Sequence, residues 1–68
     1  MDVNRVFKYH APQPGQTERY EAIREKAREL ATLIQFSTPE SREQSTALTN
    51  LQQSVMWANA AIAINEAV

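Results

Sequence analysis

The chain has 68 residues, which is the length of one small domain or of one subunit of an assembly. Seven Lys and Arg residues against eight Asp and Glu residues give a formal charge of −1, which provides no net attraction to DNA, RNA or an anionic membrane. The absence of cysteine excludes disulfide bonds and thiolate metal sites. With one histidine and one glycine, few side chains remain for catalysis, so we expect no enzyme and no cofactor.

The small size of the chain limits the stability that it can reach alone. A domain this short rarely gains more than about 3–5 kcal/mol from its own core and needs a further source of stability. Disulfides are absent and a lone histidine cannot build a structural zinc site. Oligomerisation is therefore the source of further stability that remains. The longest uncharged stretch, residues 44–65, carries many Gln, Asn, Ser and Thr residues, so we expect no membrane span.

Residues 1–16 are predicted to form an N-terminal arm and loop. They end in the segment 11–16, Ala-Pro-Gln-Pro-Gly-Gln, which holds two of the three prolines and the only glycine. Such a cluster indicates a loop rather than a helix interior. Before it, Val3, Val6 and Phe7 fit either a short helical turn or an extended arm.

The first long helix is predicted over residues 17–36, within a helical hairpin domain that takes residues 17–68. Thr17 is a candidate N-cap, and Glu18 places negative charge in the first turn, where the helix dipole favours it. Apolar residues then recur at helical spacing, which predicts one narrow stripe against a partner helix: Tyr20, Ile23, Ala27, Leu30 and Ile34.

The second helix is predicted to begin at a short turn and to reach about residue 66. Thr38 as N-cap, Pro39 at the first helical position and Glu40 after it are typical of a helix start. Ser37 with Glu40 is an alternative capping box. Because the connection is short, the sequence predicts an all-α fold, an antiparallel helical hairpin with a short N-terminal arm.

Apolar residues of the second helix form two stripes. The first can meet the first helix: Leu48, Leu51, Val55, Ala58 and Ile62. The second stripe is turned well away from the first: Trp57, Ala61, Ile64 and Val68. Small and apolar residues lie between the two stripes: Met56, Ala60, Ala63 and Ala67. A monomer would expose the second stripe, so we expect the second half of this helix to be buried between subunits.

Cations of the first helix flank its apolar stripe. Arg24 and Arg28 fall on one flank, Arg19 and Lys26 on the other, while the glutamates lie opposite the stripe. Two interpretations stay open. The long side chains either cover the edge of a core or line a groove between subunits.

Four segments in this order carry a resemblance to a known family. They are 9–12, Tyr-His-Ala-Pro; 19–24, Arg-Tyr-Glu-Ala-Ile-Arg; 38–43, Thr-Pro-Glu-Ser-Arg-Glu; and 55–66, Val-Met-Trp-Ala-Asn-Ala-Ala-Ile-Ala-Ile-Asn-Glu. Together they make residues 7–66 similar to the phage anti-CBASS sponge family (anti-CBASS protein type two), which shares its hairpin domain with a Thoeris-inhibiting sponge.

The resemblance implies a helical hairpin that assembles into a compact homo-hexamer and does no chemistry. Such proteins bind cyclic oligonucleotide second messengers in the host bacterial cytoplasm and keep them from the effector, which blocks CBASS defence. Members bind cyclic dinucleotides such as cyclic GMP–AMP between protomers, and some also bind cyclic trinucleotides on three-fold axes. Ile64 stands where relatives tend to carry a basic residue, which puts the trinucleotide site in doubt.

The residue types of the chain fit such a ligand. A cyclic dinucleotide offers two phosphates and two bases, so it needs cations, a planar group for stacking and polar groups for base edges. Tyr9 is the candidate for stacking, and Arg24 and then Lys26 are the candidates for the phosphates. The full set of candidate ligand contacts is Tyr9, Arg24, Lys26, His10, Lys8 and Tyr20.

Structural alternatives accompany these candidates. Tyr9 can pin the arm, His10 can cap or pack, and Tyr20 can belong to the core. Asn59 and Asn65 on a mostly apolar helix need partners if they are buried, either each other across a symmetry axis or a base. The main alternative function is a small helical phage assembly or regulatory protein with no small-molecule ligand.

Overall fold

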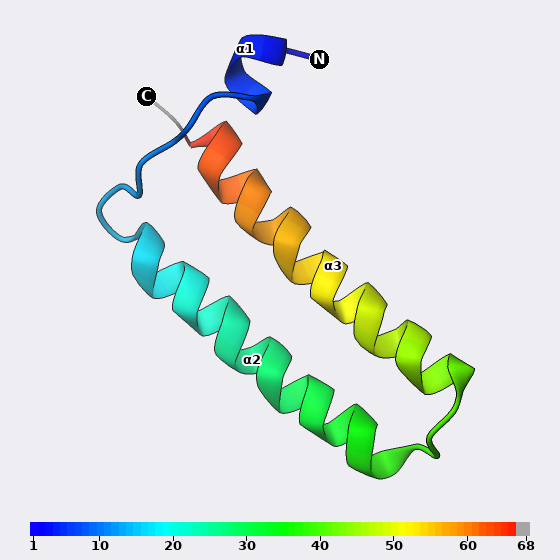
Figure 1. Ribbon diagram of the computed structural model, residues 1–68. Helices are drawn as coiled ribbons and strands as arrows, with labels where there is room; N and C mark the ends of the chain where they lie inside the picture. The colour runs from blue at the N-terminus through cyan, green and yellow to red at the C-terminus, as the bar shows by residue number, and fades with distance from the viewer. Residues whose placement is uncertain (67–68) are drawn as a thin grey trace.

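The computed structural model describes residues 1–66 and, over that range, contains three helices and no strand: α1 (Val3–Val6), α2 (Gln16–Ser37) and α3 (Arg42–Asn65). Helices α2 and α3 run antiparallel and pack against each other, and α1 lies beside the end of α3 (Figure 1). The prediction of an all-α hairpin with an N-terminal arm is confirmed. Within the described range, no helix combines the length and the hydropathy that a membrane crossing requires.

The first part of the arm, Val3–Val6, forms one short helical turn instead of an extended segment. The Asp2 carboxylate accepts a hydrogen bond from the backbone N–H of Arg5 at 3.1 Å and so caps α1. The His10 ring nitrogen Nε2 lies 2.7 Å from the carbonyl oxygen of Arg5. These two contacts answer the question that the sequence left open between a turn and an extended arm.

Helix α2 begins at Gln16, and the prediction of Thr17 as its N-cap is wrong. The N-cap is Gly15, whose φ of 85° lies in the left-handed region that glycine adopts without strain. This turn places Gln16 next to Gln13, and the backbone N–H of Gln16 donates to the Gln13 carbonyl oxygen at 3.0 Å. Its side-chain Oε1 accepts from the Gln13 N–H at 2.9 Å. Thr17 is therefore already inside the helix.

Helix α3 begins at Arg42, so the predicted start at Thr38, Pro39 and Glu40 is wrong, as is the capping box of Ser37 with Glu40. Ser37 is still part of α2. Thr38 closes that helix instead of opening the next, because its N–H donates to the carbonyl oxygen of Ile34 at 3.2 Å. Pro39 consequently lies in the turn.

The N-cap of α3 is Ser41, which lies just before the first residue of the helix. Its hydroxyl oxygen accepts a hydrogen bond from the N–H of Gln44 at 3.1 Å. The side chain of Gln44 reaches back and donates to the carbonyl oxygens of Gln35 and Thr38, both at 3.0 Å. Gln44 thus joins the end of α2 to the start of α3.

Half-buried apolar residues line the contact between α2 and α3. The first predicted stripe of α3 is confirmed: Leu48, Leu51, Val55, Ala58 and Ile62 are all half-buried. On α2, Ile23, Ala27 and Ile34 are half-buried, but Leu30 keeps 45% of its surface exposed. Among residues 1–66 no apolar side chain is buried, and the buried residue is Gln16. Two helices therefore leave the core open.

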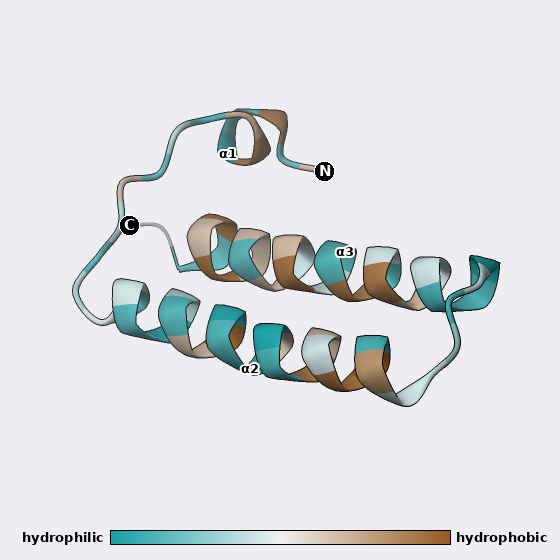
Figure 2. Ribbon diagram, turned by 60° about the horizontal axis from the view of Figure 1, so that its bottom comes forward, coloured by the Kyte–Doolittle hydropathy of each residue, from teal (hydrophilic) through white to brown (hydrophobic). Residues whose placement is uncertain are grey.

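Large apolar side chains remain exposed on α3. Trp57 is 75% exposed and Met56 is 62% exposed. Figure 2 shows apolar residues continuing into the last turns of α3, whereas the first turns of α2 are mostly hydrophilic. Val68 of the predicted second stripe and its neighbour Ala67 lie outside the described residues.

Candidate functional site

The hollows along the contact between α2 and α3 include two that helical geometry places on opposite broad faces of the hairpin. Ile23 points toward α3, so its neighbours Ala22 and Arg24 project about 100° to either side. Arg24 lines a hollow of about 490 Å³, which we call the polar hollow: Tyr20, Arg24, Val55, Asn59, Ala60 and Ala63. Ala22 lines a second hollow of about 500 Å³, the apolar groove, with Leu30, Leu51 and Ala58 among its other residues.

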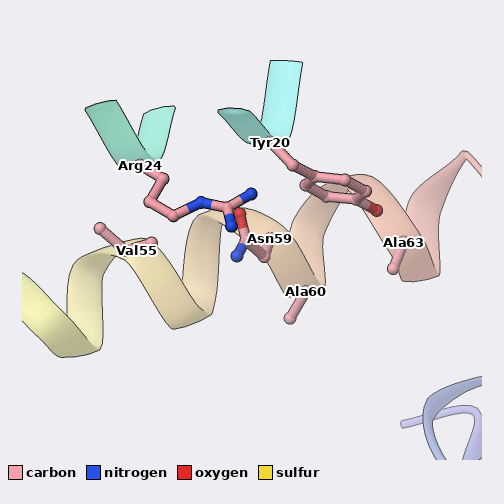
Figure 3. A pocket seen from close by; sticks show the side chains of 6 residues that line it. All are labelled: Tyr20, Arg24, Val55, Asn59, Ala60 and Ala63. Carbon is pink, nitrogen blue, oxygen red and sulfur yellow. The ribbon is translucent and has the colours of Figure 1, made fainter. Parts of the chain in front are cut away.

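The polar hollow is formed by long side chains of α2 over small side chains of α3. Tyr20 and Arg24 are one helical turn apart, so they project from the same side of α2. Figure 3 shows the Arg24 guanidinium lying over the Asn59 amide, with the Tyr20 ring beside it. Ala60 and Ala63 have short side chains, and the space above them stays open to solvent.

Arg24 forms no ion pair or hydrogen bond with any residue that the structure describes. Its nearest acidic neighbour in sequence, Glu25, is engaged by Arg28, whose Nε and Nη2 donate to the carboxylate at 3.1 and 2.6 Å. These hydrogen bonds hold the pKa of Glu25 below its ordinary value. The donors of Arg24 therefore face the polar hollow without a protein anion to satisfy them.

Asn59 contributes an unsatisfied acceptor to the same hollow. Its side-chain Oδ1 is buried and, among residues 1–66, has no hydrogen-bond partner. Asn65, the other asparagine singled out in the sequence, is satisfied within its own helix, because its Nδ2 donates to the carbonyl oxygen of Ala61 at 3.1 Å. Asn59 and Asn65 thus differ in their need for a partner.

The six predicted ligand contacts are distributed over three places. Tyr20 and Arg24 lie together in the polar hollow. Lys26 lines the apolar groove on the other face, and its Nζ is 3.4 Å from the Glu29 carboxylate. The other three are on the arm and do not line the polar hollow: Lys8, Tyr9 and His10.

The arm residues differ in what they contact. Tyr9 is 81% exposed, so its ring is accessible for stacking. His10 is half-buried, and its Nε2 lies 2.7 Å from the carbonyl oxygen of Arg5, which is a contact within the arm. Lys8 is exposed.

The sequence interpretation did not assign Asn59 to the ligand site. The available signal was a polar residue between Ala58 and Ala60, on a helix whose neighbouring positions are apolar. The spacing alone could not pair it with Arg24, because that pairing depends on the register between α2 and α3.

The residues that line the polar hollow can bind a ligand but offer no catalytic pair. They supply one guanidinium, one phenol ring and one amide, without the histidine or carboxylate that would act as a general base. A guanidinium and a ring suit an anion that carries a planar group.

Comparison with known proteins identifies one family. The model of the family described as Acb2/Tad1, hairpin domain, matches residues 1–63, which include the arm and nearly all of the hairpin. No curated protein and no solved structure matches the chain at a significant level.

Proposed function

Since the chain belongs to the Acb2/Tad1 hairpin-domain family, which implies a binding sponge for cyclic oligonucleotides, we propose that it sequesters cyclic dinucleotides such as cyclic GMP–AMP. It holds the ligand without cleaving it and keeps it from the CBASS effector in the cytoplasm of an infected bacterium. Cyclic trinucleotides form a second ligand class of this proposal. They need a separate test because Ile64 is apolar.

The observation that carries this proposal is the Arg24 guanidinium, which has no partner within residues 1–66 and lies beside the Tyr20 ring. A planar guanidinium binds a phosphate through two parallel hydrogen bonds and can also lie flat against a base. Both groups line one hollow that is open to solvent. Phosphate and base of one nucleotide can therefore be bound side by side.

The arm supplies the second planar surface in this proposal. The Tyr9 ring is exposed, and the contact from His10 to Arg5 fixes the segment that carries it. Stacking of a base on an aromatic ring is worth about 1–3 kcal/mol. Tyr9 thus contributes stacking, Lys8 adds a charge nearby, and His10 acts by fixing the arm.

A homo-hexamer is part of the proposal, because one hairpin neither closes its core nor encloses a ligand. Among residues 1–66 no apolar side chain is buried, and Trp57 is largely exposed. Subunits related by a two-fold axis present the same surface to each other. Two copies of Arg24 across such an axis match the two phosphates of a cyclic dinucleotide.

Calorimetry with three ligands tests this function. We expect the protein to bind a cyclic dinucleotide, to bind the linear dinucleotide of the same bases more weakly, and to release the cyclic ligand intact after denaturation. Recovery of a cleaved ligand would contradict a sponge and indicate a hydrolase. A cyclic trinucleotide that binds without competing with the dinucleotide would show that a separate site is intact.

The open core also favours the rival function, an assembly protein with no small-molecule ligand. The apolar groove and the exposed Trp57 suit contacts between subunits as well as they suit a sponge. A stable oligomer whose melting temperature does not change with any cyclic oligonucleotide would support this rival and overturn the sponge.

A further inference from the structure

We propose that Asn59 is a positioning residue for Arg24, an inference that rests on the proposed function. The Asn59 Oδ1 accepts one N–H of the Arg24 guanidinium, and this contact aims the remaining donors at the phosphate of the ligand. Asn59 itself does not touch the phosphate.

The first argument is the unsatisfied state of the Asn59 acceptor. A buried acceptor without a partner costs about 1–3 kcal/mol, and most buried side-chain polar atoms have one. The Oδ1 of Asn59 is buried and lacks a partner within residues 1–66. We therefore expect a hydrogen-bond donor to reach the Asn59 Oδ1 in the functional protein.

The second argument is the identity of the donor. Arg24 lines the same hollow and is unpaired in the described part of the chain. In the view of Figure 3 its guanidinium overlaps the Asn59 amide, and both line the same hollow, whereas the Tyr20 hydroxyl points along α3 toward Ala63. The proposed contact joins an N–H of this guanidinium to the Asn59 oxygen.

The third argument is the number of donors. A guanidinium has five N–H groups, so one can go to Asn59 while a parallel pair stays available for a phosphate. A long side chain that is held in place before binding loses less rotamer entropy when the ligand arrives. Asn59 thus raises the affinity for the cyclic dinucleotide by holding the Arg24 side chain in its binding orientation.

Direct reading of a base by the Asn59 oxygen is the alternative that this geometry disfavours. The oxygen is shielded from solvent, so a base edge reaches it only after the side chain has turned. A contact of Asn59 with a second copy of the chain is the other alternative. Both predict an effect of Asn59 that does not depend on Arg24.

A double-mutant cycle separates these possibilities. Asn59→Leu removes the acceptor at similar volume, and Asn50→Leu, an exposed asparagine of the same helix, is the matched control. We expect Asn59→Leu to weaken cyclic dinucleotide binding roughly tenfold in the parent, the size expected for one hydrogen bond to a charged group. In an Arg24→Gln background the same change is expected to cost nothing further.

A measurement without ligand tests the contact itself. In the ¹⁵N spectrum of the free protein, we expect a resolved Arg24 Nε–H signal that moves to the position of a solvated arginine in Asn59→Leu. Light scattering checks that the variant keeps the oligomeric state of the parent, and Asn59→Ala replaces it if it does not.

The outcomes are distinguishable from failure of the proposed function. A parent that binds no cyclic dinucleotide overturns the proposed function and this inference together. A parent that binds, with equal losses from Asn59→Leu in both backgrounds or an unchanged Arg24 signal, overturns this inference alone.

Discussion

Arg19 and Glu66 form a two-bond ion pair that ties the first turns of α2 to the end of α3, although they are 47 residues apart in the chain. Gln16 adds a third hydrogen bond, because its Nε2 donates to the Glu66 carboxylate at 3.2 Å. Gln16 also holds the loop through Gln13, so one carboxylate links the arm, α2 and α3. These hydrogen bonds, first from Arg19 and then from Gln16, lower the pKa of Glu66 to about 2.

The lowered pKa of Glu66 predicts a stability that depends on pH. The folded carboxyl has a pKa of about 2 and the unfolded carboxyl about 4.5, so the unfolded state binds more protons between these values. The contribution of the ion pair is present above pH 4.5 and is lost as the pH falls toward 2. We expect the melting temperature of the parent to fall over this window by more than that of Glu66→Gln, as followed by circular dichroism. Equal slopes for the two proteins would contradict this prediction, and Glu21→Gln is the control.

Replacement of Trp57 is predicted to dissociate the assembly. Trp57 is 75% exposed on the hairpin, and in the proposed hexamer it lies between subunits. Trp57→Glu places an unpaired charge in that contact, which is strongly unfavourable. We expect light scattering to report monomers with a lowered melting temperature. Phe36→Glu is the control, because Phe36 is 82% exposed near the turn, away from the second half of α3.

Arg24 and Lys26 are predicted to differ in their effects on ligand affinity. Arg24 lines the polar hollow without an ion pair in the described residues, whereas Lys26 lines the opposite face and is paired with Glu29. Loss of a charge-assisted contact costs about 1.5–3 kcal/mol, so Arg24→Gln is expected to weaken binding about 10- to 150-fold. Lys26→Gln removes the same charge and is expected to change affinity less than threefold by calorimetry. A larger loss of affinity for Lys26→Gln would indicate that the ligand binds in the apolar groove instead.

The arm is predicted to act through the fixed position of Tyr9. Tyr9→Ala removes the exposed ring and is expected to weaken binding through lost stacking, by about 1–3 kcal/mol. His10→Ala removes the hydrogen bond to the Arg5 carbonyl and is expected to have a smaller effect in the same direction. If His10 contacts the ligand instead, His10→Ala should cost as much in a Tyr9→Ala background as in the parent.

The cap of α3 gives a prediction about stability alone. Ser41→Ala removes the hydroxyl that accepts from the Gln44 N–H, and loss of such a cap costs about 1 kcal/mol. We expect a lower melting temperature with unchanged ligand affinity per folded protein. Ser45→Ala, in the first turns of α3, is the control and should change the melting temperature little. If Ser45→Ala lowered the melting temperature as much as Ser41→Ala, the effect of Ser41→Ala could not be assigned to the loss of the cap.

The sequence determined the two long helices and their pairing because these depend on local signals. The apolar spacing from Tyr20 to Ile34 and from Leu48 to Ile62 predicts two helices and the faces that meet. The proline and glycine cluster before residue 17 and the short turn near Pro39 limit the topology to a hairpin with an arm. The helix starts were wrong by a few residues, since several neighbouring residues can cap and the choice depends on contacts such as that of Gln44.

Only the tertiary structure decided which side chains share a site. Periodicity already placed Arg24 and Lys26 on opposite flanks of the apolar stripe, but only the structure shows that Arg24 lines the polar hollow whereas Lys26 lines the apolar groove and pairs with Glu29. Asn59 joins Arg24 because the register between α2 and α3 brings them together, and no spacing within one helix encodes that register. The physical reason is that helical periodicity fixes the direction of each side chain, whereas a site depends on the distances between helices that packing sets.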